Sequence, residues 1–119
     1  MPTTLVLGAS TNPERYSYKA IVSLKAHGHD VVAISSKEGE LLGVKFEKSL
    51  PEFGNVDTVA LYVNSKIQEG FYAGIIRLNP RRVVFNPGTE NPTFEAMLNA
   101  NKIQTVQACT LVMLSIGNY

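Results

Sequence analysis

The sequence predicts a three-layer α/β domain in which helices cover both faces of a five-stranded parallel sheet. Short apolar runs of strand length alternate along the chain with segments of helical periodicity, a pattern typical of parallel sheets that are buried on both faces. The first run, Leu5-Val6-Leu7, leads through Gly8 into a polar loop and then into a helix. At 119 residues the chain is long enough to bury a core, so we expect one domain over residues 1–119.

The first half of the chain contains two strands and one well-marked helix. Ala20, Ile21 and Leu24 recur at helical spacing and form the inward stripe of that helix, and Gly28 is placed to end it as a C-cap. The elements expected here are a strand at Thr4–Leu7, a helix at Ser17–His27, a strand at Val31–Ile34, a short excursion at Leu41–Phe46 and a single helical turn at Ser49–Phe53.

The second half continues the alternation with three strands and three helices. In order they are a strand at Thr58–Val63, a helix at Lys66–Leu78, a strand at Arg82–Phe85, a helix at Pro92–Asn101, a strand at Thr105–Ala108 and a short helix at Leu111–Ile116. The last helix is apolar along most of its length, so it offers the surface of a homodimer if the core does not absorb it.

Parallel strands joined by right-handed crossovers bring all their carboxyl ends to one rim of the sheet, and ligands bind there where the strand order reverses. The segments expected at this rim are residues 8–19, 35–37, 64–66, 86–91 and 109–110. Arg77, Arg81 and Arg82 precede a strand and therefore belong to the opposite rim, where we interpret them as a solvated edge.

The loop after the first strand has the order of a nucleotide phosphate site. The N–H groups at the start of the following helix are unpaired and lie at the positive end of its dipole, which favours a phosphate. The dinucleotide signature G-x-G-x-x-G is absent, because Ser10 and Pro13 occupy the second and third glycine positions after Gly8. The loop therefore predicts a nucleotide ligand of an unusual kind.

The end of the second strand reads Ser35-Ser36-Lys37, where NAD-binding domains carry an acidic residue for the ribose hydroxyls. Hydroxyl groups and a cation favour a phosphorylated ribose instead, which both NADP and coenzyme A contain. Arg15 and Lys37 are the cations best placed to give a phosphate a charge-assisted hydrogen bond. A role as solvated surface cations is an equal alternative for both.

Composition excludes several classes of function. The net charge is +1 and no dense Lys/Arg run is present, so we expect no nucleic-acid partner. No apolar stretch reaches membrane-spanning length and no leader precedes the first strand, so we expect no membrane association and a cytoplasmic protein. One cysteine excludes an internal disulfide, and with His27 and His29 it makes no metal set, so no metal site is predicted.

Individual reactive residues give no catalytic set. Cys109 follows the fifth strand at the ligand rim, where a thiol could meet the thiol end of coenzyme A, but a buried and inert cysteine is the favoured interpretation. Glu90 is interpreted as a solvated loop residue, and His27 and His29 as surface residues at a helix end. We therefore predict no catalytic residues.

Five segments in register resemble a known family, the stand-alone CoA-binding domain proteins, which are similar to the CoA-binding domain of the succinyl-CoA synthetase alpha subunit. The segments are VLGASTNPERYSYKAI, HGHDVVAISSKEGELLGVKFEKSLPEF, VDTVALYVNS, VVFNPGTENP and ACTLVML. The resemblance implies a Rossmann-like domain that holds the phosphates of coenzyme A at the first loop. It also implies that the end of the second strand holds the adenosine.

Carried over by position, the resemblance assigns residues to each part of the ligand. Those beside the phosphates are Gly8, Ala9, Ser10, Asn12, Arg15, Ser17 and Tyr18, those beside the adenosine are Ser36 and Lys37, and Asn64 lies at the same rim. The chain departs from the family at Ser35-Ser36, where many members have Asn-Pro, so contacts on the adenosine side are expected to differ. The phosphorylated histidine and nucleotide-activating domain of the synthetases are not visible in the sequence.

Three classes of function follow. The favoured one is a module that binds coenzyme A or an acyl-CoA without catalysis of its own. A second is an NADP-type dinucleotide-binding protein. The cation at the end of the second strand favours this class as well, although the chain has no second domain for a substrate. The third is a regulatory or interaction subunit with a vestigial nucleotide pocket, which the missing glycines permit.

Overall fold

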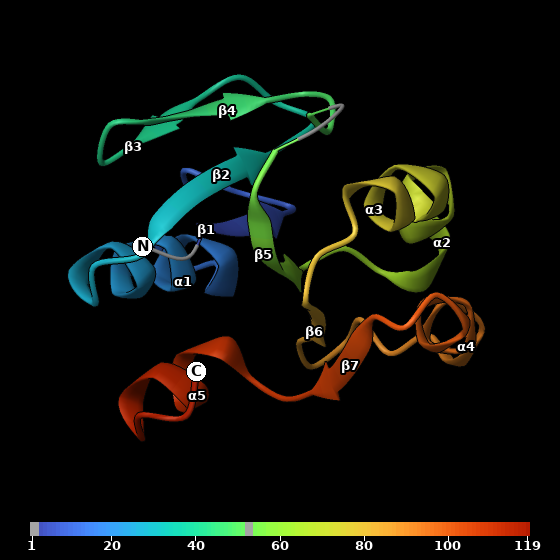
Figure 1. The fold of residues 1–119 in the computed structure, drawn as a ribbon. Helices are drawn as coiled ribbons and strands as arrows, with labels where there is room; N and C mark the ends of the chain where they lie inside the picture. The colour runs from blue at the N-terminus through green and yellow to red at the C-terminus, as the bar shows by residue number, and fades with distance from the viewer. Residues whose placement is uncertain (1–2, 52–53) are drawn as a thin grey trace.

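The computed structural model describes residues 3–51 and 54–119 and has the expected α/β class, with one mixed sheet between two helical layers (Figure 1). The sheet has the strand order β3-β4-β2-β1-β5-β6-β7. The strands are β1 (Thr3–Leu7), β2 (Asp30–Ile34), β3 (Glu40–Leu41), β4 (Val44–Glu47), β5 (Val56–Leu61), β6 (Arg82–Phe85) and β7 (Gln104–Gln107). The helices are α1 (Tyr16–Ala26), α2 (Ser65–Gln68), the 3-10 turn η1 (Glu69–Phe71), α3 (Tyr72–Leu78), α4 (Pro92–Ala100) and α5 (Thr110–Ser115).

The strand β1 lies in the middle of the sheet and pairs in parallel with β2 on one side and β5 on the other. From β1 the chain builds outward through β2 to β4, then crosses back to β5 and continues outward to β7. The strand order therefore reverses between β1 and β5, and the carboxyl ends of these strands open a crevice where a ligand can enter.

The prediction of five parallel strands is wrong in number, because the segment expected as a short excursion forms a hairpin, β3 and β4. The strand β4 extends the sheet in parallel beside β2, while β3 pairs with β4 in the antiparallel direction. Leu42 and Gly43 turn the hairpin with φ of 51° and 81°, as a two-residue primed turn requires. A strand with only Val44 and Phe46 facing inward is too short to give a clear pattern.

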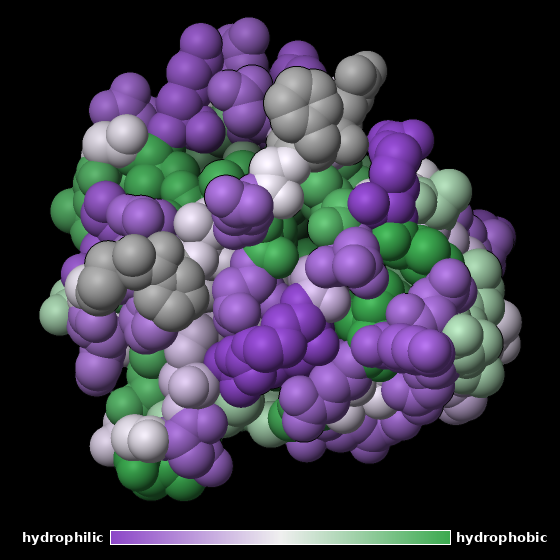
Figure 2. All heavy atoms as spheres, viewed as in Figure 1, coloured by the Kyte–Doolittle hydropathy of each residue, from purple (hydrophilic) through white to green (hydrophobic). Residues whose placement is uncertain are grey.

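The two faces of the sheet bury separate cores. Helices α1 and α5 cover one face, and α2, α3 and α4 cover the other (Figure 1). On the α1 side, Ile21 and Leu24 pack with Val6 of β1, as the inward stripe predicted. On the α4 side, Phe94 and Leu98 pack with the inward residues of the central strands. Hydrophilic side chains cover most of the face seen in Figure 2, with smaller hydrophobic areas between them.

The helix expected over Lys66–Leu78 is divided into α2, η1 and α3. Two features explain the break: Gly70 lowers helix propensity in the middle of the segment, and Gln68 is held in the interior by hydrogen bonds to neighbouring loops. Within the turn expected at Ser49–Phe53, Ser49–Pro51 is irregular, and positions 52 and 53 lie outside the described residues.

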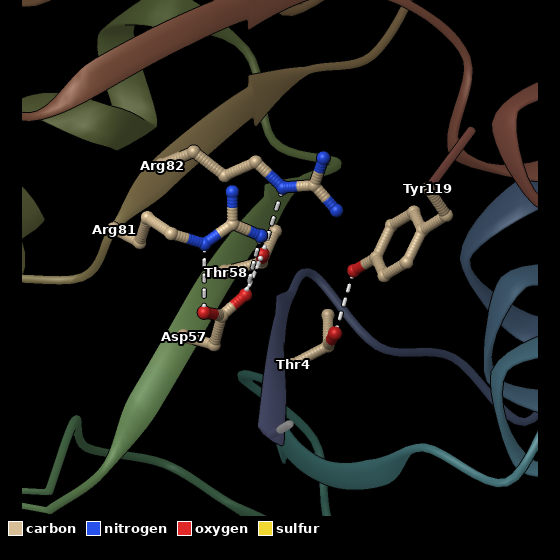
Figure 3. Close-up of polar contacts among 6 residues, drawn as sticks. All are labelled: Thr4, Asp57, Thr58, Arg81, Arg82 and Tyr119. Carbon is tan, nitrogen blue, oxygen red and sulfur yellow. Dashed lines mark hydrogen bonds and ion pairs between the residues drawn. The ribbon is translucent and has the colours of Figure 1, made fainter. Parts of the chain in front are cut away.

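A network of polar contacts fills the amino rim of the sheet on the α1 side (Figure 3). Thr4, Thr58 and Arg82 are register partners on β1, β5 and β6. Arg82 is only 6% exposed and donates from Nε to the Thr58 hydroxyl at 2.9 Å, while its guanidinium stacks on the Tyr119 ring. Tyr119 is hydrogen-bonded through its hydroxyl to Thr4.

The interpretation of Arg82 as part of a solvated edge is therefore wrong, because the tyrosine ring and the sheet cover it. Arg77 and Arg81 are exposed, as expected, and Arg81 forms a bidentate ion pair with Asp57. His27 is exposed at the end of α1, whereas His29 is half-buried with its ring 5.1 Å from that of Tyr119.

Candidate functional site

A cleft of about 1030 Å³ opens at the carboxyl ends of the parallel strands, where the strand order reverses. Its walls come from the loops after β1, β2, β4, β5, β6 and β7. The residues that line it are Leu7, Gly8, Ala9, Ser10, Glu14, Arg15, Tyr16, Ser17, Ile34, Ser35, Ser36, Lys37, Lys48, Tyr62, Val63, Asn64, Ile67, Phe71, Asn86, Pro87, Gly88, Thr89 and Cys109.

Gly8 gives the first loop its shape. Its φ is +105°, and a Cβ at this position would lie 2.9 Å from Cγ1 of Val63, so neither the conformation nor the space admits a side chain. The N–H groups of Gly8 and Ala9 both donate to the carbonyl of Ile34, each at 2.9 Å. These bonds tie the start of the loop to β2 and leave the following residues facing the cleft.

Side chains within the loop brace its turn. The Ser10 hydroxyl accepts a hydrogen bond from the Asn12 backbone N–H at 3.0 Å, and the Asn12 side chain accepts one from the Glu14 N–H at 3.0 Å. Such local bonds are typical of turns built from Ser and Asn. Ser10 therefore combines a structural role with a place on the cleft wall.

The amino end of α1 points its free donors toward the cleft. Arg15 is the N-cap residue, and its side chain makes no capping hydrogen bond. Within residues 3–51 and 54–119, the N–H groups of Tyr16 and Ser17 have no protein acceptor. No acidic residue lies in the first turn. An anion here would meet unpaired donors and the positive end of the helix dipole.

Three cations border this end of the cleft: Arg15, Lys37 and Lys48. None of the three forms an ion pair with a carboxylate in the described part of the chain, where the Arg81–Asp57 pair is found at the opposite rim. One carboxylate, that of Glu14, also lines the cleft, so the lining carries an excess of positive charge. An unpaired cluster of cations in a concave site attracts anionic ligands.

Lys48 was missed by the sequence prediction. It follows β4, which the sequence pattern left as an excursion rather than a strand. Because β4 runs parallel to β2, its carboxyl end reaches the same rim and brings Lys48 to the cleft. The signal for β4 in the sequence is the alternation Val44-Lys45-Phe46-Glu47, buried and exposed in turn, which at four residues is too short to distinguish a strand from an irregular segment.

The opposite wall of the cleft is fixed by a buried amide network. Gln68, fully buried, donates from Nε2 to the carbonyls of Val63 at 2.9 Å and Thr89 at 2.8 Å. Its Oε1 accepts from Nδ2 of Asn91 at 2.9 Å, which also donates to the Tyr72 hydroxyl at 2.8 Å. The loop after β6 is thus joined to the loop after β5 and does not depend on a ligand for its position.

Asn86 joins the same wall to the last helix. Its Nδ2 donates to the Leu61 carbonyl at 3.0 Å, and its Oδ1 accepts from the Thr110 N–H at 2.8 Å. The Thr89 hydroxyl donates to the Asn86 carbonyl at 2.7 Å. Both side chains that line the cleft here are therefore already engaged with the fold.

Cys109 is only partly buried and lines the cleft just before α5, so the expectation of a buried cysteine is wrong. The strand β7 lies at the sheet edge, where fewer side chains cover its carboxyl end. Nearby, the hydroxyls of Tyr62 and Thr110 are buried without a hydrogen-bond partner among the described residues. Burial raises the pKa of Tyr62 well above its ordinary value, so the phenol stays protonated.

Eight of the ten site residues expected from the sequence line this one cleft: Gly8, Ala9, Ser10, Arg15, Ser17, Ser36, Lys37 and Asn64. Asn12 and Tyr18 do not line it. The Asn12 side chain is engaged in the turn that it braces, and Tyr18 is the third residue of α1. Glu90 is exposed and accepts from the Gly88 N–H, which makes it a brace of its own loop.

Neither a metal cluster nor a membrane-spanning helix is found in residues 3–51 and 54–119. No group of three or more His, Cys, Asp or Glu side chains there is arranged to hold a metal ion. No helix in the same residues is long and apolar enough to cross a membrane.

Comparison with known proteins was decisive for the family. A sequence profile described as a CoA binding domain matches residues 2–115, nearly the whole chain. The chain belongs to the CoA-binding domain family. The family resemblance expected from the five sequence segments is thereby confirmed. No curated protein matches this CoA-binding domain.

Solved structures share the fold of this CoA-binding domain. A crystal structure of an uncharacterized protein is 46% identical, with a TM-score of 0.97, and the match covers 100% of this chain and 98% of that one. The cell-free ID.343 protein from Thermus thermophilus is 23% identical, with a TM-score of 0.86 and coverage of 99% and 90%.

A similar domain occurs within a larger enzyme. The dinucleotide forming acetyl-coenzyme A synthetase 1 of Ca. Korarchaeum cryptofilum, solved with phosphate and ADP, is 19% identical, with a TM-score of 0.70. The match covers 89% of this chain and 25% of that one. At this identity the likeness concerns the fold alone.

Proposed function

We propose that this protein binds coenzyme A or an acyl-CoA in the cleft at the carboxyl rim, without catalysis of its own. The observation that carries the proposal is the set of three cations without carboxylate partners, Arg15, Lys37 and Lys48, beside the free N–H groups of α1. Coenzyme A carries a diphosphate and a phosphorylated ribose, and such a ligand needs both kinds of donor. Membership of the CoA-binding domain family supports the same ligand.

Each part of the ligand has a place in the cleft under this proposal. The diphosphate lies against the loop from Gly8 to Ser10 and the start of α1, where Arg15 and the N–H of Ser17 donate to it. The ribose phosphate lies at the end of β2, where Ser36 and Lys37 meet it and Lys48 is a further cation. The pantetheine arm crosses from the end of β1 past Asn64, so that its thiol end reaches the half of the cleft that follows β5, β6 and β7.

A binding role without chemistry is supported by the state of the polar side chains deeper in the cleft. Asn86 and Thr89 carry an amide and a hydroxyl group, which are not general acids or bases near neutral pH, and both are held by hydrogen bonds of the fold. The cytoplasmic location stays a prediction. A homodimer through α5 also stays a prediction, and the exposed apolar side chains of Val112 on this helix and of Ile116 at its end are consistent with it.

The test is isothermal titration of coenzyme A, dephospho-coenzyme A and NADP into the purified protein, and into the variant with Arg15→Ala and Lys37→Ala. Coenzyme A should bind most tightly. Loss of the ribose phosphate should weaken binding at least about tenfold, and the double variant at least about 150-fold, since each hydrogen bond to a charged group contributes roughly 1.5–3 kcal/mol. Arg77→Ala is the matched control, because Arg77 is an exposed cation on α3 that does not line the cleft.

The outcomes separate the three functional classes. NADP binding tighter than coenzyme A would replace the proposal with a dinucleotide-binding protein. Absence of binding for all three ligands would favour a regulatory subunit with a vestigial pocket. Equal loss of binding in Arg77→Ala and in the double variant would show that net charge, rather than the cleft, attracts the ligand.

A further inference from the structure

The charges that line the cleft are confined to one half of it. Glu14, Arg15, Lys37 and Lys48 follow β1, β2 and β4. The half of the cleft that follows β5, β6 and β7 contributes no Asp, Glu, Lys or Arg among the described residues. From β2 to β7 there are four strand spacings in the sheet order. At about 4.8 Å each, this is about 19 Å. The cleft therefore fits a long ligand that is anionic at one end only.

In the uncharged half, the polar side chains are largely taken up by the protein itself. Asn86 uses both its donor and its acceptor within the fold, and the Thr89 hydroxyl donates to a carbonyl. Asn64 accepts from the Ile67 N–H with its side-chain oxygen at 2.9 Å. The Tyr62 hydroxyl in this half has no hydrogen-bond partner among the described residues, but it is buried. A ligand in this half therefore finds few accessible polar partners, so contacts between apolar surfaces must supply most of its affinity there.

Apolar side chains are exposed in the same half. Ile67 lines the cleft and is 50% exposed, although it is a large aliphatic residue. Val63, Phe71 and Pro87 line the cleft beside it, and Val63 and Phe71 also pack on the core, which fixes their positions. Exposed apolar surface that is continuous with a binding cleft marks the place of an apolar part of the ligand.

We propose that this half of the cleft, lined by Val63, Ile67, Phe71 and Pro87, holds the acyl group of a CoA thioester, so that the protein binds apolar acyl-CoAs more tightly than free coenzyme A. The inference rests on the proposed function and specifies its ligand class. The charged half fixes the nucleotide, and the apolar half selects what is attached to the sulfur. A negatively charged acyl group, such as a dicarboxylic one, finds no cation in the second half and is disfavoured.

The test is titration of the full chain with coenzyme A, acetyl-CoA, butyryl-CoA, hexanoyl-CoA and succinyl-CoA. Affinity should rise about two- to fourfold for each methylene that the apolar half covers, because a buried methylene contributes up to about 0.8 kcal/mol. Succinyl-CoA should bind more weakly than butyryl-CoA, which has an acyl chain of equal length and no charge.

The variant Ile67→Ser should flatten the dependence on chain length and weaken hexanoyl-CoA more than coenzyme A. Val112→Ser is the matched control: Val112 is 52% exposed, close to Ile67, but lies on α5 and does not line the cleft. It should leave the whole series unchanged. Equal affinity across the series, or an equal effect of Ile67→Ser on every ligand, would overturn the acyl assignment while leaving coenzyme A binding intact. Failure of every ligand to bind would overturn the proposed function as well.

Discussion

The two rims of the sheet are both rich in polar residues, but they use them differently. At the amino rim, the polar groups pair with one another: Arg81 with Asp57, Arg82 with Thr58, and Tyr119 with Thr4 (Figure 3). At the carboxyl rim, the cations that border the cleft have no carboxylate partner in the described part of the chain.

This difference separates stability from binding. A cation that is already paired gains little from an anionic ligand, whereas an unpaired cation at a helix start can give its hydrogen bonds to one. Substitutions at the amino rim should therefore change stability and leave ligand affinity intact. Substitutions at the carboxyl rim should change ligand affinity. Substitutions of the supporting residues below that rim should change both stability and ligand affinity.

The largest effect is expected for Gln68→Ala, below the carboxyl rim. The substitution leaves the carbonyls of Val63 and Thr89 and the Asn91 amide without their buried partner. We expect a loss of about 3 kcal/mol in the free energy of unfolding, since each buried unsatisfied group costs roughly 1–3 kcal/mol. Urea denaturation measures this loss. Affinity for coenzyme A should also fall, and stability near that of the wild type would show that the network does not hold the wall.

Gly8→Ala should follow, with a loss of about 2 kcal/mol, because a non-glycine residue at φ of +105° is strained and its Cβ would lie 2.9 Å from the Val63 side chain. Thermal unfolding measures the stability, and titration with coenzyme A measures the binding. Gly43→Ala is the control for backbone strain alone, since Gly43 also has a positive φ but no atom within 4 Å of its added Cβ. It should destabilise less and leave binding unchanged.

Arg82→Met tests the amino rim. It keeps an apolar stem against Tyr119 but removes the hydrogen bond to Thr58 and the stacked cation. We expect a loss of about 1–2 kcal/mol, from one charge-assisted hydrogen bond and one cation–π contact. Because Arg82 lies at the amino rim, the dissociation constant of the variant for coenzyme A should equal that of the wild type. A weaker complex would mean that the two rims are coupled.

Asp57→Asn should have the smallest effect, at most about 1 kcal/mol, because the ion pair with Arg81 is largely solvated. The hydrogen bonds from Arg81 lower the pKa of Asp57 in the folded protein. The pair therefore stabilises the fold above the unfolded pKa of about 3.9, and this contribution is lost as the pH falls through the lower folded value. Denaturation of both proteins from pH 7 down to about pH 2 measures it, and the difference between their stabilities should begin to shrink below about pH 4 and vanish at the acid end.

Much of the carboxyl rim followed from the sequence because parallel strands fix which loops meet. Once Leu5–Leu7 and Val31–Ile34 are read as parallel strands, the loops with Arg15 and Lys37 must lie at one edge. Lys48 was not predicted at the cleft because the alternation of buried and exposed residues in β4 covers only four residues, which is too short to identify a strand. Asn12 and Tyr18 were carried over by position in a motif, which does not tell which way a side chain points.

The sequence by itself determined the class of fold, the inward stripe of α1 and the order of strand, Gly8 loop and helix at the start of the chain, because these depend on local periodicity and on residues adjacent in the chain. Tertiary structure alone decided the burial of Arg82 and the hydrogen bonds that join Gln68 to Thr89 and Asn91. Each depends on a partner more than ten residues away, such as Tyr119 over Arg82 and the Thr89 carbonyl beside Gln68. The division of the cleft into a charged and an apolar half belongs to the same level, because it arises from the order of the strands rather than from the order of the residues.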